Sequence, residues 1–498
     1  MRKDKVTAAE ILGKITAFSG KKGFPVYLVG GYIRDTILRR KSKDIDVVME
    51  SDALVFARDF AREYRLPPPV FYGRFGTAMI EIDGIKLEFA TARKESYPED
   101  SRKPQVEKAT ILEDCRRRDF TINAIARNLL TGEIIDFFNG RKDIKRRIIR
   151  TPVEADRTFY DDPLRILRGI RFAARFRFEI EKETLEGMRK NVPRLSIVSQ
   201  ERIADEIMKT LEASVPSRGF YLMDETGVLD AVMPEVSGLK EKQNVYHCKE
   251  LLPHTLKVLD NASKHTKDVY LRMAALLHDI GKPRTFRYDN GKVSFHRHEF
   301  VGERMAYKLC RRLNIPEEKN KFIGRMIRFH LRPHLLAKEN PTDNALRRFI
   351  REMGKDMMPL FTLAKADLTS HNPGRVQKAL EKLSLLENRV KEINKKDRLT
   401  SFRLALDGYA IMEILGVPSG KIIGQVKDIL EGLVIDGLLK NRKRALKKYL
   451  EEHGKEFKKL QAPSPPFLRQ GFGRQESSPR KIEEETGKRA EEDENEEE

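Results

Sequence analysis

The sequence predicts an α+β head that is followed by mostly α-helical regions. Residues 1 to about 150 alternate short apolar, strand-like runs with helical patterns, whereas helical spacing of apolar residues dominates from about 151 onward. The chain has 498 residues, which is more than one compact core usually occupies, so we expect several domains. We detect no internal repeat.

The first informative stretch predicts a strand, a helix and a second strand. Residues 26–29 have the pattern of a short buried strand, residues 32–40 of a helix, and residues 44–49 of another strand. Side chains alternate along a strand, so Asp44 and Asp46 share one face. Two neighbouring carboxylates repel each other unless a cation lies beside them, which makes this pair a candidate site for a divalent metal.

A Gly-Gly turn begins fourteen residues before this aspartate pair. Gly30 and Gly31 allow a phosphate to approach backbone N–H groups at the start of the following helix. A phosphate cradle opposite two metal-binding carboxylates is the arrangement that phosphoryl or nucleotidyl transfer requires. Taken singly, an Asp-x-Asp is usually a solvated strand edge and a Gly-Gly pair is usually only a turn. Their combination in one unit favours the functional interpretation.

This stretch, Leu-Val-Gly-Gly-Tyr-Ile-Arg-Asp followed by Asp-Ile-Asp-Val-Val, resembles the signature of a known family. The family is the bacterial-type (class II) tRNA nucleotidyltransferases and poly(A) polymerases, within the DNA-polymerase-beta-like nucleotidyltransferase superfamily. The resemblance implies that Asp44 and Asp46 are catalytic ligands of Mg²⁺. It also implies that Gly30, Gly31 and Arg34 bind the nucleotide phosphates.

A third carboxylate belongs to the next strand pair. Arg-Phe-Gly-Thr-Ala over residues 74–78 opens a hairpin-like pair, whose second strand covers residues 85–91. Its apolar side chains face inward and leave Glu88 on the opposite, polar face. Glu88 is therefore a candidate partner of the two aspartates, although an exposed strand residue would give the same pattern.

The octet Arg-Arg-Asp-Phe-Thr-Ile-Asn-Ala over residues 117–124 resembles the family's second motif. The adjacent guanidinium groups of Arg117 and Arg118 suit the oxygens of a triphosphate. Asp119 and Asn123 can orient ribose hydroxyls or those arginines. An Arg-Arg pair by itself would be interpreted as a solvated face.

The third motif is Asp-Asp-Pro-Leu-Arg-Ile-Leu-Arg over residues 161–168. Pro163 suits the first turn of a helix after an acidic N-cap. Asp162 and Arg165 are three residues apart and share a helix face, and Arg168 lies one turn further on. In the family, an acid and an arginine at these positions pair with the incoming base, which implies that Asp162 and Arg165 select C or A. The family usually has Glu-Asp where this chain has Asp-Asp; the alternative is a capped helix with a surface salt bridge.

A second constellation has different chemistry. Seven of the ten histidines fall between His254 and Asp367, and an apolar run leads into His278-Asp-Ile-Gly-Lys282. The spacing resembles the HD superfamily of metal phosphohydrolases. The resemblance implies a divalent metal of unknown identity bound by four ligands, and two further histidines that contact a second metal or a phosphate. The four ligands are His254, His278, Asp279 and Asp367, and the further histidines are His298 and His330. The alternative is a helical domain that has lost its metal.

Charge and composition narrow the partners. The net charge is +21 with a pI of about 9.6, although the last seventeen residues are strongly acidic. A globular protein this basic is expected to bind a polyanion, which the resemblance narrows to tRNA, with CTP and ATP as substrates. No run of about eighteen apolar residues is present, so we expect no membrane span. Cys115, Cys248 and Cys310 are scattered, which favours a reducing, cytoplasmic location over a disulfide framework or zinc ribbon.

These motifs divide the chain into five expected regions. They are a nucleotidyltransferase catalytic head (1–150), a helical neck for base selection and RNA binding (151–244), an HD metal phosphohydrolase domain (245–375), a helical C-terminal tRNA-binding region (376–455) and a disordered charged tail (456–498).

Three smaller features accompany this division. Glu201 and Arg202 begin a helix that resembles the family's support for the base-reading segment, where they are expected to brace Asp162 and Arg165. Residues 406–424 resemble the family's C-terminal tRNA-contacting segment. Gly420 and Gly424 in this segment could admit RNA backbone, and simple helix capping explains them equally well. Residues 441–450 form a basic amphipathic helix that is consistent with phosphate contact.

The resulting hypothesis is template-independent addition of CCA to tRNA 3′ ends by two-metal nucleotidyl transfer. The HD region would add a phosphatase or 2′,3′-cyclic phosphodiesterase activity. A poly(A) polymerase, or an enzyme that adds only A or only CC, is the alternative within the same class. The alternative of another class is a catalytically inactive RNA-binding scaffold.

Overall fold

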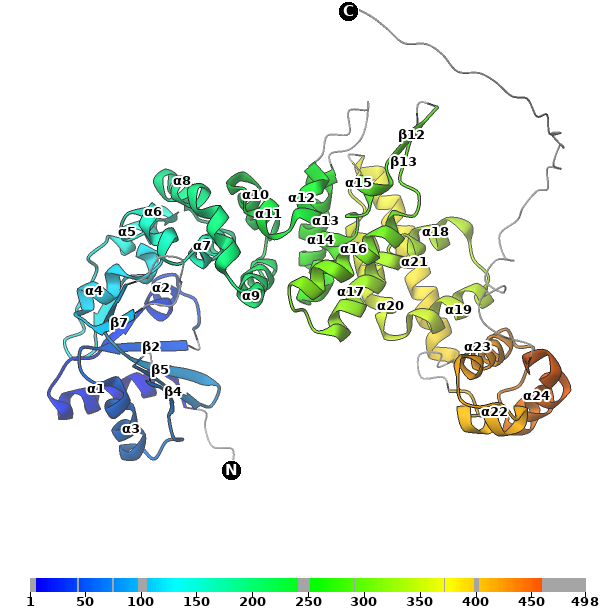
Figure 1. Cartoon of the computed structure of the whole chain (residues 1–498), viewed down its shortest axis with the longest axis horizontal. Coiled ribbons are helices and arrows are strands. Elements are labelled where there is room, and N and C mark those ends of the chain that lie inside the picture. Colours follow the sequence, from blue (N-terminus) through cyan, green and yellow to red (C-terminus); the bar gives the residue numbers. More distant parts are fainter. Residues whose placement is uncertain are drawn as a thin grey trace, which may run out of the picture. The chain divides into compact units, whose positions relative to one another are not determined.

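The computed structural model describes residues 6–42, 44–73, 76–96, 105–240, 251–290, 292–370, 372–397 and 403–458. The chain divides into two compact units, Met1–Thr400 and Ser401–Glu498. Figure 1 labels their helices and strands, and the two units are described separately.

A seven-stranded sheet forms the centre of the head. Its strands, in spatial order, are β3 (Val70–Tyr72), β4 (Thr77–Ile82), β5 (Ile85–Thr91), β2 (Asp44–Met49), β1 (Tyr27–Val29), β8 (Ala126–Asn128) and β9 (Ile134–Ile135). Strands β2 and β5 run parallel, and the other neighbours in this sheet are antiparallel. The predicted strand at residues 44–49 is confirmed, as is the strand at residues 85–91.

One face of this sheet carries the core of the head. Helices α1 (Ala8–Lys22) and α3 (Ala53–Glu63) supply Phe18, Phe56 and Phe60, whose rings pack at centroid distances of 5.0 to 6.3 Å. Phe89 of β5 joins them, 5.4 Å from Phe56. Aromatic packing of this kind fixes α1 and α3 on the sheet. The acidic residues of β2 and β5 consequently face the other side.

Shorter elements surround the sheet. They are α2 (Gly31–Ile37), the hairpin β6 (Arg93–Ser96) and β7 (Gln105–Lys108), α4 (Ile111–Arg116), the 3₁₀ turn η2 (Thr121–Asn123) and α5 (Gly140–Arg146). Helix α2 starts one residue earlier and ends three residues earlier than predicted. It ends there because Leu38 is the C-cap and Arg39 takes a positive φ of 55°.

The neck is helical, as predicted. Its elements are the two-stranded parallel pair β10 (Ile148–Ile149) and β11 (Glu179–Ile180), α6 (Ala155–Asp161), α7 (Leu164–Phe176), α8 (Lys182–Asn191), η3 (Val192–Ile197), α9 (Gln200–Leu211), α10 (Ser217–Thr226), α11 (Val228–Val232), α12 (Pro234–Ser237) and η4 (Gly238–Lys240). The apolar residues that recur at helical spacing along α7 are buried, including Ile166, Leu167 and Ile170. Gly169 lets α7 pack closely, since a Cβ there would lie 2.8 Å from the ring of Phe120 in the head.

The following region is a bundle of helices with one hairpin. Its elements are α13 (Leu251–His265), α14 (Val269–Leu277), α15 (Lys282–Thr285), β12 (Arg287–Asp289), β13 (Lys292–Ser294), α16 (His298–Arg312), α17 (Glu317–Phe329), α18 (Arg332–Glu339), α19 (Asp343–Met353), η5 (Gly354–Asp356), α20 (Met357–Ala366) and α21 (Pro373–Asp397). Arg272 joins it to the neck, because its buried guanidinium donates to the carbonyl oxygens of Leu211 and Ala213 at 2.6 and 3.0 Å.

The second unit has a core of its own. Helices α22 (Gly408–Leu415), α23 (Lys421–Ile435) and α24 (Lys443–Lys458) surround buried residues such as Ile411, Val426 and Leu446. Of the tail predicted at residues 456–498, the first three residues end α24, and the rest lies outside the described residues.

Candidate active site

A cleft of about 1260 Å³ brings the three predicted motifs of the head and neck together. Its lining includes nine arginines and four carboxylates. The arginines are Arg34, Arg93, Arg117, Arg118, Arg165, Arg168, Arg171, Arg175 and Arg202, and the carboxylates are Asp46, Glu88, Asp119 and Asp162. Such an excess of guanidinium groups around a few carboxylates suits a polyphosphate with an accompanying cation.

The acidic edge of the cleft is formed by β2 and β5. The parallel register places Asp46 beside Glu88 and Asp44 beside Lys86, so the three carboxylates share one face of the sheet. Burial raises the pKa of Asp46; Arg118 opposes this shift, and Asp44 adds to it. Glu88 is solvent-exposed but stands in the cleft, where partial desolvation and the charge of Asp46 raise its pKa. Asp44 is exposed at the start of β2 and is not part of the cleft lining.

These carboxylates fit a divalent cation. Mg²⁺ prefers oxygen ligands, and Asp46 and Glu88 lie side by side at the edge of the cleft. Burial is the main cause of their raised pKa values, and the neighbouring carboxylate adds to it. The third carboxylate anticipated from the alternation of residues 85–91 therefore lies where the sequence placed it. Its role as a metal ligand stays a prediction.

The Gly-Gly turn lies against this edge. Gly30 precedes α2 with a φ of +68°, and a Cβ there would lie 2.9 Å from Nη1 of Arg118 and 3.4 Å from Oδ2 of Asp46. Only glycine combines this backbone conformation with so close an approach. Gly31 begins α2, so backbone N–H groups face the cleft next to the acidic edge.

A chain of charged and polar side chains crosses the floor of the cleft. Arg34 donates to Oδ1 of Asn123 at 2.6 Å, Asn123 donates to Oδ1 of Asp119 at 2.9 Å, and Arg168 donates to Oδ2 of Asp119 at 2.8 Å. Burial raises the pKa of Asp119, but Arg168 and these hydrogen bonds outweigh it, so the pKa falls to about 2. Four of the predicted residues thus form one network and hold each other in place.

Arg117 and Arg118 share a partner that the motif reading did not anticipate. Asp114, fully buried on α4, accepts from Arg117 at 2.5 Å and from Arg118 at 2.9 Å, one oxygen for each guanidinium. Burial raises the pKa of Asp114, but the two arginines lower it by more, so the net shift is downward. The spacings i,i+3 and i,i+4 on a helix were the available signal.

The predicted base-reading pair, Asp162 and Arg165, lies at the start of α7. The helix begins at Leu164 with Pro163 as its N-cap, one residue later than an N-cap at Asp162 would give. Asp162 still accepts from the N–H of Leu164 at 3.3 Å. Arg165 donates to the carbonyl of Arg117 at 2.9 Å, which couples the third motif to the second. Both side chains line the cleft.

Helix α9 is fixed to α7 by a residue that the sequence analysis did not single out. Glu201 accepts a hydrogen bond from Asn314 at 3.3 Å on the surface, whereas Arg202 lines the cleft. Glu206, one turn further along, pairs with Arg171 of α7 at 2.6 Å, and both side chains are buried. A buried carboxylate–guanidinium pair fixes α9 to α7. The expected bracing of Asp162 and Arg165 by Glu201 and Arg202 stays a prediction.

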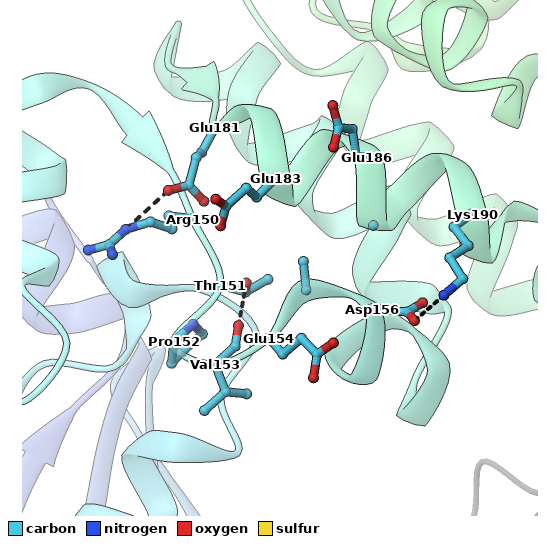
Figure 2. A pocket seen from close by; sticks show the side chains of 12 residues that line it. Arg150, Thr151, Pro152, Val153, Glu154, Asp156, Glu181, Glu183, Glu186 and Lys190 are labelled. Atoms are coloured by element: carbon cyan, nitrogen blue, oxygen red, sulfur yellow. Dashed lines mark hydrogen bonds and ion pairs between the residues drawn. The ribbon is translucent and has the colours of Figure 1, made fainter.

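A second cavity, of about 450 Å³, lies among the end of the head, α6 and α8 (Figure 2). It is lined by five carboxylates, Glu154, Asp156, Glu181, Glu183 and Glu186, and by the cations Arg150 and Lys190. Arg150 lies 3.9 Å from Glu181, and Lys190 pairs with Asp156. Its negative charge disfavours a nucleoside triphosphate.

The predicted HD residues meet in one cluster within the helical bundle. Two groups could hold a metal ion: His254, His278 and Asp367 form one, and Asp279, His298 and His330 form the other. Nε2 of His254 lies 3.2 Å from Asp367 and 3.4 Å from Asp279. The Nε2 atoms of His298 and His330 are 3.3 Å apart. Residues separated by more than a hundred positions thus converge on one point.

Each imidazole is oriented for metal binding. The Nδ1 atoms contact an oxygen at 2.7 to 2.9 Å: Thr369 Oγ1 for His254, and the carbonyls of Ala275, Phe295 and Ile327 for His278, His298 and His330. This fixes the rings with Nε2 toward the cluster, as is usual for metal-ligating histidines. Thr369 was not anticipated, because it is far from His254 in sequence.

The charges of this centre also fit a divalent cation. Burial lowers the pKa of His278, but Asp279 and Asp367 raise it more, to about 10. The carboxyl pKa values of Asp279 and Asp367 fall well below their usual range despite burial, chiefly because of His278. Nε2 of His278 and Oδ1 of Asp279 are buried and have no hydrogen-bond partner among the described residues. Buried donors and acceptors of this kind are normally satisfied, and a metal ion would satisfy them.

The C-terminal features are only partly placed by the structure. Gly420 is the N-cap of α23, and Gly424 lies in its first turn; a Cβ at either position would meet nothing within 4 Å. Helix α24 covers most of the predicted basic helix at residues 441–450. RNA contact by these residues stays a prediction. No helix among the described residues is long and apolar enough to span a membrane.

The paired carboxylates on a mixed sheet, next to a Gly-Gly turn, define a polymerase-beta-like nucleotidyltransferase head that is joined to a helical neck and an HD domain. Family models match residues 26–150 ("Poly A polymerase head domain"), 177–239 ("Probable RNA and SrmB- binding site of polymerase A") and 251–366 ("HD domain"). The chain belongs to the bacterial-type tRNA nucleotidyltransferase and poly(A) polymerase family.

Three curated relatives illustrate the likeness. The "Multifunctional CCA protein" of Nitrosococcus oceani is 34% identical over 65% of this chain and 80% of its own length. The "A-adding tRNA nucleotidyltransferase" of Deinococcus radiodurans is 29% identical over 80% of this chain and 89% of its own length. The protein of the same name from Aquifex aeolicus is 38% identical over 40% of this chain, which spans only 25% of that relative.

A solved structure has the same architecture. It is entitled "The complex structure of CCA-adding enzyme with CTP", and the match has a TM-score of 0.59 at 26% identity, covering 90% of this chain and 96% of the other.

Proposed function

We propose that this chain adds the CCA sequence to tRNA 3′ ends from CTP and ATP without a nucleic-acid template. The observation that carries the proposal is that one cleft contains the Asp46–Glu88 edge, the arginine cradle and the Asp162–Arg165 pair. Relatives named for CCA addition and a solved relative in complex with CTP support the choice of substrates.

The reaction forms a bond from the RNA 3′-oxygen to the α-phosphorus of the nucleotide. The bond to the leaving pyrophosphate breaks, and the 3′-hydroxyl proton passes to solvent. Mg²⁺ held by Asp44 and Asp46, with Glu88 beside them, would lower the pKa of the 3′-hydroxyl and stabilise the pyrophosphate. Gly30, Gly31 and the neighbouring arginines position the triphosphate.

Base choice is assigned to the start of α7. The carboxylate of Asp162 accepts from the exocyclic amine of C or A, and the guanidinium of Arg165 donates to the adjacent ring acceptor. The hydrogen bond from Arg165 to the carbonyl of Arg117 holds this pair next to the triphosphate site. On the Watson–Crick edge, U has no exocyclic amine, and the amine of G neighbours an N–H donor rather than an acceptor, so neither base matches this pair.

The test is extension of a 3′-trimmed tRNA with Mg²⁺ and CTP, ATP or both, resolved to single nucleotides. Addition of C, C and A followed by a stop supports the proposal. Addition of one A only, or of CC only, indicates a partial enzyme, and a long A ladder indicates a poly(A) polymerase. Binding of tRNA without any extension would indicate an RNA-binding scaffold.

The HD cluster favours a second activity. Two groups of metal-binding atoms share one buried centre, and Nε2 of His278 and Oδ1 of Asp279 lack hydrogen-bond partners there. We propose that this centre hydrolyses phosphate esters at RNA ends, as a phosphatase or 2′,3′-cyclic phosphodiesterase. A bound divalent cation would supply an activated water and charge stabilisation. Release of phosphate from a 3′-phosphate, or opening of a cyclic phosphate, tests this with Mn²⁺, Ni²⁺ and Co²⁺ in turn.

A further inference from the structure

A hairpin interrupts the HD region between two parts of its metal-binding cluster. Strands β12 and β13 lie between Lys282, which contacts Asp279, and His298, which belongs to the second metal-binding group. Figure 1 shows the hairpin standing out from helices α15 and α16. The register pairs Arg287 with Ser294 and Tyr288 with Val293.

Both ends of this hairpin are fixed at the cluster. Nζ of Lys282 lies 2.6 Å from Oδ2 of Asp279 and 5.6 Å from the ring centre of Phe295, at the end of the second strand. The carbonyl of Phe295 contacts Nδ1 of His298 at 2.9 Å. The ring of Phe286 packs on that of Phe295 at 6.0 Å. Whatever binds along the hairpin therefore lies next to the metal-binding centre.

The surface of the hairpin is basic and carries an aromatic ring. Its exposed cations are Arg287 and Lys292 on the strands, flanked by Arg284 of α15 and by Arg297 at the start of α16. One exposed acid, Asp289, lies opposite Lys292 in the register. None of the four side chains forms an ion pair or hydrogen bond with a described residue. Tyr288 has half of its surface exposed. By contrast, Arg325 and Arg312 of the same helical region each pair with a carboxylate. Packing does not account for the hairpin's composition.

We propose that this hairpin, residues 284–297, binds single-stranded RNA whose 3′-terminal phosphate lies at the HD centre. Arg284, Arg287 and Lys292 contact backbone phosphates. Tyr288 lies on the opposite face of the two-stranded ribbon from Arg287 and Lys292, and a base that passes the ribbon's edge stacks on it. The proposal rests on the phosphohydrolase function above and specifies its substrate class: the end of an RNA chain, rather than a free nucleotide.

The extent of the hairpin supports a polynucleotide. Each strand of three residues spans roughly 10 Å, which carries the cations away from the metal-binding atoms. A mononucleotide has its single phosphate at the centre and leaves those cations without a partner. An RNA strand places further phosphates along them. Opening of its terminal cyclic phosphate forms one bond from a water oxygen to phosphorus and breaks one phosphorus–ribose oxygen bond, and the ribose oxygen takes the proton.

The experiment compares two substrates on the full chain loaded with a divalent metal. They are 2′,3′-cyclic AMP and a short RNA that ends in a 2′,3′-cyclic phosphate. For the double variant Arg287→Glu/Lys292→Glu we expect the KM for the RNA to rise roughly tenfold. The kcat for the RNA and the rate of 2′,3′-cyclic AMP hydrolysis should each change less than twofold. An equal loss on both substrates would overturn the proposal, since the hairpin would then only support the metal site. An unchanged KM for the RNA would overturn it as well.

Lys355→Glu is the matched control. Lys355 is exposed, and its Nζ lies 3.5 Å from the carboxylate of Glu318 on α17. Glu318 is twelve residues before His330, hence roughly 18 Å along the helix from the metal-binding cluster. The same charge reversal there should leave both substrates unaffected. Tyr288→Ala should raise the KM for the RNA at least about fivefold, and Tyr288→Phe should restore it, because stacking needs the ring but not the hydroxyl.

Photo-crosslinking separates this proposal from the phosphohydrolase function. An RNA carrying a photoreactive base near its 3′ end is crosslinked to the metal-free full chain, and the labelled peptides are mapped. Label within residues 284–297 supports RNA docking even if neither substrate is hydrolysed, in which case only the phosphohydrolase function fails. Absence of label there overturns the docking proposal, whatever the hydrolytic activity.

Discussion

Gly30 is the residue at which the Gly-Gly turn and the acidic edge meet. Replacing it with alanine combines a positive φ with a Cβ 2.9 Å from Arg118 and 3.4 Å from Asp46. We expect Gly30→Ala to lower kcat/KM for nucleotide addition by at least tenfold and to destabilise the head by about 1 to 2 kcal/mol. Steady-state extension rates and a thermal melt measure the two effects.

Gly84→Ala is the control for backbone strain alone. Gly84 has a φ of +81°, but a Cβ there would meet nothing within 4 Å. This variant should lose similar stability and keep its activity. A Gly30→Ala protein with normal extension rates would contradict the role assigned to the turn.

Asp119 links acid stability to the cleft. Its pKa in the folded chain is about 2, compared with an ordinary value of 3.8. Because the folded pKa is the lower one, the carboxylate stabilises the fold above about pH 4, and this contribution is lost as the pH falls toward 2. It amounts to about 2 kcal/mol at neutral pH. We therefore expect Asp119→Asn to lower the Tm at pH 7, with the difference from the parent chain shrinking toward pH 2.5.

Asp205→Asn on α9 is the matched control for this pH dependence. Asp205 is exposed and, among the described residues, forms an ion pair only with Lys209, four residues along the same helix. An exposed pair of this kind contributes little, so its Tm should follow that of the parent chain at every pH. A Tm difference for Asp119→Asn that does not vary with pH would show that the carboxylate charge is not the cause.

The sequence identified the residues that line the cleft better than the buried residues that fix their side chains in place. Arg117, Asp119 and Asp162 were found because short motifs keep them together in sequence. Asp114 and Glu206, which fix Arg117 and Arg171, were missed because a buried carboxylate on a helix looks like a surface residue until its partner is located in space.

Among the elements, the pairing of β2 with β5 decides whether a third carboxylate joins the acidic edge. The register places Glu88 beside Asp46. We expect Glu88→Gln to reduce the rate of nucleotide addition by about 10- to 100-fold and to raise the Mg²⁺ concentration needed for half-maximal rate, because one negative charge leaves the cation site. Extension rates measured across a Mg²⁺ titration test this.

Glu81→Gln offers a comparison within the same hairpin. Glu81 is exposed on β4 opposite Lys86 and lies outside the cleft lining. Its replacement should leave the Mg²⁺ dependence unchanged. If both variants behave like the parent chain, Glu88 is only an exposed strand residue.

The elements themselves were largely predictable, and their limits less so. The strand at residues 44–49 follows from alternation and β-branched residues, and the buried stripe of α7 follows from helical spacing. The ends of α2 depend on the positive φ of Gly30 and Arg39, which no apolar pattern encodes. The parallel pairing of β2 with β5 joins residues 42 positions apart, so sequence periodicity specified their faces but not their register.

Taken as a whole, the chain has two candidate reaction centres built from separate residues. Asp46→Asn should abolish nucleotide addition and leave phosphate hydrolysis unchanged, and Asp279→Asn should do the reverse, each by at least about a hundredfold. Both activities are measured on the same preparations. Loss of both activities in either variant would mean that the centres are coupled or that the chain misfolds, which a thermal melt distinguishes.

The order of the head, neck and HD regions was predictable from motifs along the sequence. The residues that build the HD centre were only partly predictable. Its four predicted ligands and two further histidines converge as the spacing implied, whereas Thr369 behind His254 was recognised only in three dimensions. The division of the chain at Thr400 reflects where contacts become few, which composition does not reveal.

Gly281, the fourth residue of His-Asp-Ile-Gly-Lys, has a consequence for reading related sequences. A Cβ at this position would lie 2.1 Å from the carbonyl oxygen of His298 and 2.7 Å from the amide nitrogen of Gly302. The backbone before α15 therefore touches the first turn of α16 directly, and any side chain would push His298 away from Asp279. In a related HD domain, a larger residue at the position of Gly281 would displace the histidine that corresponds to His298. The residue at this one position therefore indicates whether the metal-binding cluster can assemble.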